Sequence, residues 1–217
     1  MFKLVMKGNI QEHCEFPIWS DFHLQGSIQV KSLEVSGDAK IIGFLQTLDK
    51  INILGSLFVS DVLDVGGDVS IHNDLFVGGD LNIDGDLVVG GDLEVEGDLE
   101  VGGKLFVKGE VYVQGDVEVG GGSVINGCMD VYCSAKVMKH FTVYGYLSVK
   151  KNLSVKGNLD VGVNLFVRGN LFVGTNLLIH RDMHVNNDFL KIKGCILRRF
   201  ALLEEIDPPA YDNSIAC

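Results

Sequence analysis

A six-residue period runs through almost the whole chain and restricts it to one kind of fold. From Gly67 onward the sequence divides into hexads such as GDVSIH, NDLFVG, GDLNID, GDLVVG and GDLEVE, and this phase continues to about residue 192. Toward the N-terminus the register holds until one residue is missing within Gly26–Val30, and a shifted frame covers the chain from about residue 8. Repetition at a short fixed period is the signature of a solenoid, in which each repeat contacts its neighbours.

The hexads place apolar residues at their third and fifth positions, as Leu93 and Val95 show. A spacing of two puts both side chains on one face of a short strand, and the residue between them, here Glu94, on the other face. Gly or another small residue typically opens the hexad, and Asp or Asn often follows it. These residue types accept the left-handed or turn conformations that a corner needs. The pattern predicts short parallel strands joined by corners, with three hexads in each coil.

We therefore predict an all-β fold, a single-stranded triangular parallel β-helix of about ten coils and about 50 Å in length. Residues three hexads apart are expected to share one inward column, in which the small Ser123 lies next to the large Phe141. The predicted organisation is an N-terminal cap with irregular first coils over 1–25, the β-helix over 26–192, and a C-terminal helix and tail over 193–217.

The segment from Cys195 to Ile206 carries a different apolar spacing. Ile196, Phe200 and Leu203 fit one face of an amphipathic helix, which we expect to cap the last coil. Prolines follow at once and end such a helix.

Pro208, Pro209, Ala210 and Tyr211 form PPAY, which resembles the PPxY ligand of WW domains. Partner binding through Pro208, Pro209 and Tyr211 is one reading of this motif, and plain helix-stop chemistry is the other.

Composition narrows the range of partners. The net charge of -11 argues against nucleic acid. No run of about 18 apolar residues is present, which predicts no spanning helix and leaves only peripheral contact with a membrane. The cysteines are odd in number and scattered, and we expect reduced thiols in an intracellular, cytoplasmic setting: Cys14, Cys128, Cys133, Cys195 and Cys217.

Charge is segregated along the predicted rod. Residues 51–103 contain twelve acidic side chains and no Lys or Arg, whereas residues 104–200 contain thirteen basic and seven acidic side chains. Solvated corners that drift in composition are one explanation. The other is that the asymmetry orients packing with neighbouring molecules.

Two features invite a chemical function. The ladder that includes Asp68, Asp80 and Asp92 suggests calcium, but Asn152 and Asn158 occupy the same repeat position later in the chain. This interchange indicates hydrogen bonds to the corner backbone, so we predict no metal site and no cofactor. Six histidines suggest an acyltransferase of the hexapeptide-repeat class, but both inner positions are aliphatic and no inserted loop forms a pocket. We predict no catalytic residues and no enzyme activity.

The GDLxVx repeats over residues 26–192 resemble bactofilins and related polymer-forming hexapeptide-repeat proteins. That resemblance implies a triangular right-handed β-helix that joins end to end into filaments, a non-catalytic structural role, and partners that are further copies or other structural proteins. The predicted C-terminal helix departs from the flexible tails of bactofilins and is expected to obstruct stacking at that end. The arrays are also similar to those of large DNA viruses, which gives the alternative of a minor capsid or other virion protein.

Overall fold

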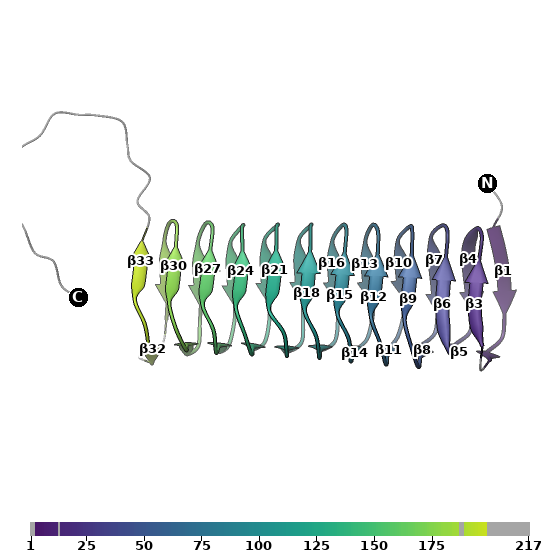
Figure 1. The fold of residues 1–217 in the computed structure, drawn as a ribbon, viewed down its shortest axis with the longest axis horizontal. Helices are drawn as coiled ribbons and strands as arrows, with labels where there is room; N and C mark the ends of the chain where they lie inside the picture. Colours follow the sequence, from purple (N-terminus) through teal and green to yellow (C-terminus); the bar gives the residue numbers. More distant parts are fainter. Residues whose placement is uncertain (1–2, 13, 187–188, 199–217) are drawn as a thin grey trace, which may run out of the picture.

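The computed structural model describes residues 3–12, 14–186 and 189–198, and this part of the chain winds into a rod of stacked three-sided coils (Figure 1). Three parallel sheets of 11 strands each run along the rod, one on each side. The predicted triangular parallel β-helix is therefore confirmed, with eleven coils in place of about ten. No helix is found among the described residues.

Successive strands of each sheet are three elements apart in the chain. Sheet A contains β1 (Lys3–Lys7), β4 (Asp21–Gln25), β7 (Ala39–Ile42), β10 (Leu57–Val59), β13 (Leu75–Val77), β16 (Leu93–Val95), β19 (Val111–Val113), β22 (Met129–Val131), β25 (Leu147–Val149), β28 (Leu165–Val167) and β31 (Met183–Val185). Sheet B contains β2 (Ile10–Gln11), β5 (Ile28–Val30), β8 (Leu45–Thr47), β11 (Leu63–Val65), β14 (Leu81–Ile83), β17 (Leu99–Val101), β20 (Val117–Val119), β23 (Ala135–Val137), β26 (Leu153–Val155), β29 (Leu171–Val173) and β32 (Leu190–Ile192). Sheet C contains β3 (Glu15–Ile18), β6 (Ser32–Val35), β9 (Ile51–Ile53), β12 (Val69–Ile71), β15 (Leu87–Val89), β18 (Leu105–Val107), β21 (Ser123–Ile125), β24 (Phe141–Val143), β27 (Leu159–Val161), β30 (Leu177–Ile179) and β33 (Ile196–Arg198).

The core consists of the third and fifth residues of the hexads, as the alternation predicts. Leu93 is 1% exposed and Val95 is fully buried, whereas Glu94 between them is exposed. Each buried aliphatic side chain of this size contributes about 1.5–3 kcal/mol. Because each coil contacts mainly its two neighbours, the end coils are the least supported part of the rod.

The predicted stacking of residues three hexads apart is also confirmed. Ser123 pairs with Leu105 on one side and with Phe141 on the other, and all three side chains are almost fully buried. A small residue thus makes room for the large ring in the next coil.

One coil near the N-terminus is a residue shorter, as expected from the missing residue within Gly26–Val30. Ile28 pairs with Leu45, whereas Leu33 pairs with Ile51, so the first step along the chain is one residue shorter than the second. The shortening falls at the corner between β5 and β6, and the three sheets remain continuous across it.

Most corner glycines serve a purpose different from the one the sequence suggested. Among the described glycines, positive φ occurs at Gly8, Gly26 and Gly43, in the first three corners between sheets A and B. In the regular coils the constraint is close approach. A Cβ atom on Gly85 would lie 2.7 Å from the Gly67 carbonyl oxygen and closer still to Asp68 Oδ1. Glycine at this hexad position therefore leaves room for the aspartate side chain of the preceding coil.

The C-terminal prediction is wrong where the structure describes it. Ile196–Arg198 form strand β33, which pairs in parallel with β30, so no helix begins at Cys195. One extra residue between β31 and β32 shifts the frame, and Leu171 accordingly pairs with Leu190 and not with Phe189, the partner in an unbroken hexad frame. Backbone pairing with β30 stabilises a strand here, although the local apolar spacing suits a helix. The other capping residues, Phe200 and Leu203, lie outside the described residues.

The N-terminal segment forms a strand and does not cover the first coil. Lys3–Lys7 make up β1, which pairs with β4 as the first strand of sheet A. The solenoid therefore starts before residue 26 and continues beyond residue 192, and its two described ends are open strand edges (Figure 1).

Candidate interaction surfaces

The corners are held by side-chain ladders that run along the rod. Asp86 N donates to Asp68 Oδ1 at 2.8 Å, and Asn170 N donates to Asn152 Oδ1 at 2.9 Å. A carboxylate and a side-chain amide both present an oxygen acceptor, so Asp and Asn are interchangeable here. The predicted hydrogen bonding of these residues to corner backbone is confirmed. Among the described residues, no group of three or more His, Cys, Asp or Glu side chains is arranged to hold a metal ion.

Apolar side chains are partly uncovered at both ends of the rod. At the N-terminal end Leu4 is 40% exposed, and Met6, Ile10 and Phe16 are only partly buried against the core. At the C-terminal end Leu190 is 44% and Ile196 is 48% exposed. These residues occupy inward columns that are fully buried in the central coils, so each end, as far as the described residues go, presents apolar surface together with an edge strand that has one partner strand.

The third coil, β7 to β9 with the corners that follow, carries exposed apolar residues at all three corners. Phe44 follows β7, Leu48 follows β8 and Leu54 follows β9, and Leu48 is 72% exposed. The coils after it place glycine or a polar residue at most of these positions. We call these three residues the apolar corners.

Aromatic and charged side chains line the outer face of sheet A in its central coils. The Tyr112 and Tyr132 rings meet edge to face at 5.2 Å between centroids, and Lys150 Nζ lies 2.8 Å from the Tyr132 centroid. The interaction with the Tyr132 hydroxyl raises the pKa of Tyr112. Hydrogen bonds with Tyr112 and Lys150 lower the pKa of Tyr132.

Tyr146 makes a short hydrogen bond to a strand of this face. Its hydroxyl donates to Asp130 Oδ2 at 2.6 Å, and this bond, with a smaller contribution from burial, raises the pKa of Tyr146 to about 12. The groove beside it holds about 190 Å³.

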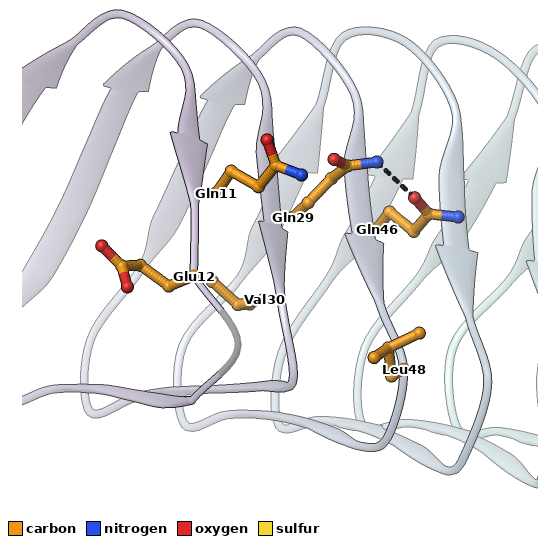
Figure 2. Close-up of a pocket in the computed structure, with 6 residues that line it drawn as sticks. All are labelled: Gln11, Glu12, Gln29, Val30, Gln46 and Leu48. Carbon is orange, nitrogen blue, oxygen red and sulfur yellow. Dashed lines mark hydrogen bonds between the residues drawn. The ribbon is translucent and has the colours of Figure 1, made fainter.

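The grooves along the rod are small, with volumes of about 140 to 290 Å³. Figure 2 shows one on sheet B, of about 190 Å³, where the side chains of Gln11, Gln29 and Gln46 follow one another along the sheet. Gln29 Nε2 donates to Gln46 Oε1 at 2.6 Å, and Gln46 Nε2 donates to Asp64 Oδ2 at 2.8 Å. The groove is smaller than the about 300–1,000 Å³ of most small-molecule sites.

The histidines are spread over separate parts of the rod. His140 Nδ1 accepts a hydrogen bond from Asn158 N at 3.0 Å, and His180 lies 3.4 Å from the Asp160 carboxylate. His23 and His184 occupy the outer face of sheet A near opposite ends. These four side chains are therefore not brought together in one site.

Of the residues singled out from the sequence as partner-binding or capping, the structure places Ile196, at the last strand of sheet C. Pro208, Pro209 and Tyr211 lie outside the described residues, as do Phe200 and Leu203. The sequence reasoning missed the partly uncovered inward columns at the two ends, although apolar hexads at the first and last repeats are a signal for them.

Comparison with protein-family models, with curated proteins and with solved structures finds no match to this chain. Within the described residues we find no helix with the length and apolar character needed to span a bilayer.

Proposed function

We propose that this chain is a non-catalytic structural protein whose stiff β-solenoid associates end to end with further copies, as in the bactofilin-like polymers that it resembles. The observation that supports this most directly is the uncovered apolar surface at both ends, where Leu4, Leu190 and Ile196 are 40%, 44% and 48% exposed. Stacking another coil on either edge buries these side chains and pairs the free backbone groups of the edge strands.

Electron microscopy of negatively stained particles and sedimentation velocity of the 217-residue chain test this proposal. We expect particles that are multiples of the single rod, which is about 50 Å long. Leu190→Asp places a charge on the C-terminal edge and should return the protein to single rods.

Phe166→Asp is the matched control, because Phe166 is 41% exposed but lies on the outer face of sheet A, one coil before the edge strand β31. It should leave end-to-end association unchanged. Single rods of the unaltered protein at every accessible concentration, or equal effects of the two substitutions, would overturn the proposal.

A second candidate is a single rod packed against other subunits of a larger assembly, such as a virion shell. The apolar corners favour it, since exposed Phe44, Leu48 and Leu54 surround one coil and are not needed for end-to-end contact. Single rods that bind a shell subunit, with binding lost in Leu48→Ser, would favour this function over polymerisation.

A further inference from the structure

The two ends of the rod are complementary in direction. Strands β1, β2 and β3 form the N-terminal edge and β31, β32 and β33 form the C-terminal edge, and every pairing between them along the rod is parallel. Only a head-to-tail stack continues all three sheets with the same strand direction and the same order. Stacks of like ends reverse the direction at the joint.

We propose that the joint is head to tail, with the C-terminal edge of one copy seated on the N-terminal edge of the next and Cys195 beside Cys14 of that copy. This inference rests on the proposed end-to-end association. The register carries it further, because each column of one copy then continues in the next. The column that ends at Leu190 continues with Ile10 of the next copy, and the column that ends at Ile196 continues with Phe16, so apolar side chains stack on apolar side chains.

Charge at the edge of sheet B favours the same polarity. Glu12 stands in an inward column of sheet B in which the following coils carry Val30, Thr47 and Val65. Figure 2 shows its carboxylate pointing away from Val30 and from the row of glutamines. In a head-to-tail joint Ile192 lies directly over Glu12. The exposed Lys191 and Lys193, on either side of Ile192, are then the basic residues nearest to Glu12.

Stacks of like ends lack this complementarity. A joint between two N-terminal edges brings both copies of Glu12 to one interface, and a joint between two C-terminal edges does the same with Lys191 and Lys193. Like charges across an interface oppose association, and complementary charges fix the register.

Two native cysteines report this geometry directly. Cys14 lies between β2 and β3, and Cys195 lies between β32 and β33, so both occupy the same edge of the triangular rod at opposite ends. Both are free and exposed. Backbone bonding places Cys14 in the column that ends at Gly194, since Lys31 N donates to Cys14 O and Gly194 N donates to Thr175 O.

Cys195 follows Gly194, and in the joint it becomes the diagonal neighbour of Cys14. With a rise of about 4.8 Å per coil and about 3.8 Å between consecutive Cα atoms, the two Cα atoms lie about 6 Å apart, within the range of a disulfide.

Oxidative cross-linking tests the joint. The substitutions Cys128→Ser, Cys133→Ser and Cys217→Ser leave Cys14 and Cys195 as the only thiols. Diamide then accepts two electrons and two protons as the two thiols form one S–S bond. We expect a ladder of covalent multimers on a non-reducing gel, with the Cys14–Cys195 peptide found by mass spectrometry. Removing either remaining cysteine should abolish the ladder. Dimers linked only through Cys14–Cys14 or Cys195–Cys195 would overturn the head-to-tail joint.

Charge reversal gives a second measurement. Glu12→Lys should weaken association about tenfold, as should Lys191→Glu with Lys193→Glu, and combining all three should restore most of the loss. Lys156→Glu, at an exposed position away from both ends, should have no such effect. Absence of association under any condition contradicts the proposed function itself. Association that gives only like-end cross-links, or whose strength is unchanged by these charge reversals, contradicts only the head-to-tail joint.

Discussion

The Oδ1 atom of Asp68 lies 2.8 Å from the backbone nitrogen of Asp86 and accepts its hydrogen bond, one full coil further along the chain. The same bond recurs one coil later, where Lys104 N donates to Asp86 Oδ1 at 2.7 Å. A corner side chain thus binds the next coil in the same direction as the strands do. The repeat therefore stabilises its corners as well as its faces.

The corner bond predicts a difference between two substitutions at Asp80, whose Oδ1 accepts from Asp98 N at 2.9 Å. Asp80→Asn keeps an oxygen acceptor and should stay within about 0.5 kcal/mol of the unaltered protein in free energy of unfolding. Asp80→Ala removes the acceptor and should cost about 1 kcal/mol, measured by denaturant unfolding. Asp84→Ala, at an exposed aspartate outside the ladder, is the control. Equal losses for Asn and Ala at position 80 would contradict the ladder.

Calcium should leave the melting temperature unchanged, and so should a chelator. One oxygen of Asp80, Asp92 and Asp98 already accepts a backbone hydrogen bond, and the same position accepts Asn elsewhere in the chain. Differential scanning calorimetry with and without calcium checks this expectation. A rise of several degrees would mean that the ladder binds the ion.

Very different effects on stability are expected at two adjacent residues of β16. Leu93→Asp puts an unpaired charge into the core and should destabilise the protein by more than about 3 kcal/mol. Glu94→Lys changes a side chain that points to solvent and should be nearly neutral. Thermal unfolding of both variants measures the contrast, and similar shifts would contradict the assigned faces.

Ser123 is a position where substitution should stabilise the rod. Its hydroxyl is buried and has no hydrogen-bond partner among the described residues. Ser123→Ala removes this unsatisfied group and should raise the free energy of unfolding by about 1 kcal/mol. Ser123→Leu should lower it, because the ring of Phe141 fills the adjacent coil of the same column. Denaturant unfolding compares the two variants, and a stabilising leucine would contradict tight packing in this column.

The hexad pattern predicts most of the fold because every constraint in it is local and repeated. Positions three and five fix the inward face, and the missing residue within Gly26–Val30 appears as the shorter coil. The pattern fails at Ile196, where one extra residue shifts the frame and the remaining apolar spacing also suits a helix. Free edge groups on β30 decide between the two structures, and they belong to the preceding coil, outside any local window of sequence.

The outer face of sheet A is less predictable than the core. Tyr112 and Asp130 share a column, which the register of three hexads per coil indicates. The bond from Tyr146 to Asp130 joins a corner to a strand and depends on side-chain conformation. Periodicity alone gives no signal for such a contact.

That bond gives the last prediction, a loss of stability at high pH. The Asp130 carboxylate raises the pKa of Tyr146 from 10.0 to about 12. In the unfolded chain the phenol ionises near 10, so between these values the unfolded state binds fewer protons and stability falls as pH rises. The contribution of Tyr146 is fully present below pH 10 and is lost toward pH 12.

The measurement is the difference in free energy of unfolding between the unaltered protein and Tyr146→Phe. This difference should be constant at neutral pH and shrink from about pH 10 to about pH 12. Tyr144→Phe controls for loss of a phenol as such, since Tyr144 is 61% exposed. A difference for Tyr146→Phe that does not change with pH would show that the bond to Asp130 contributes nothing to folding.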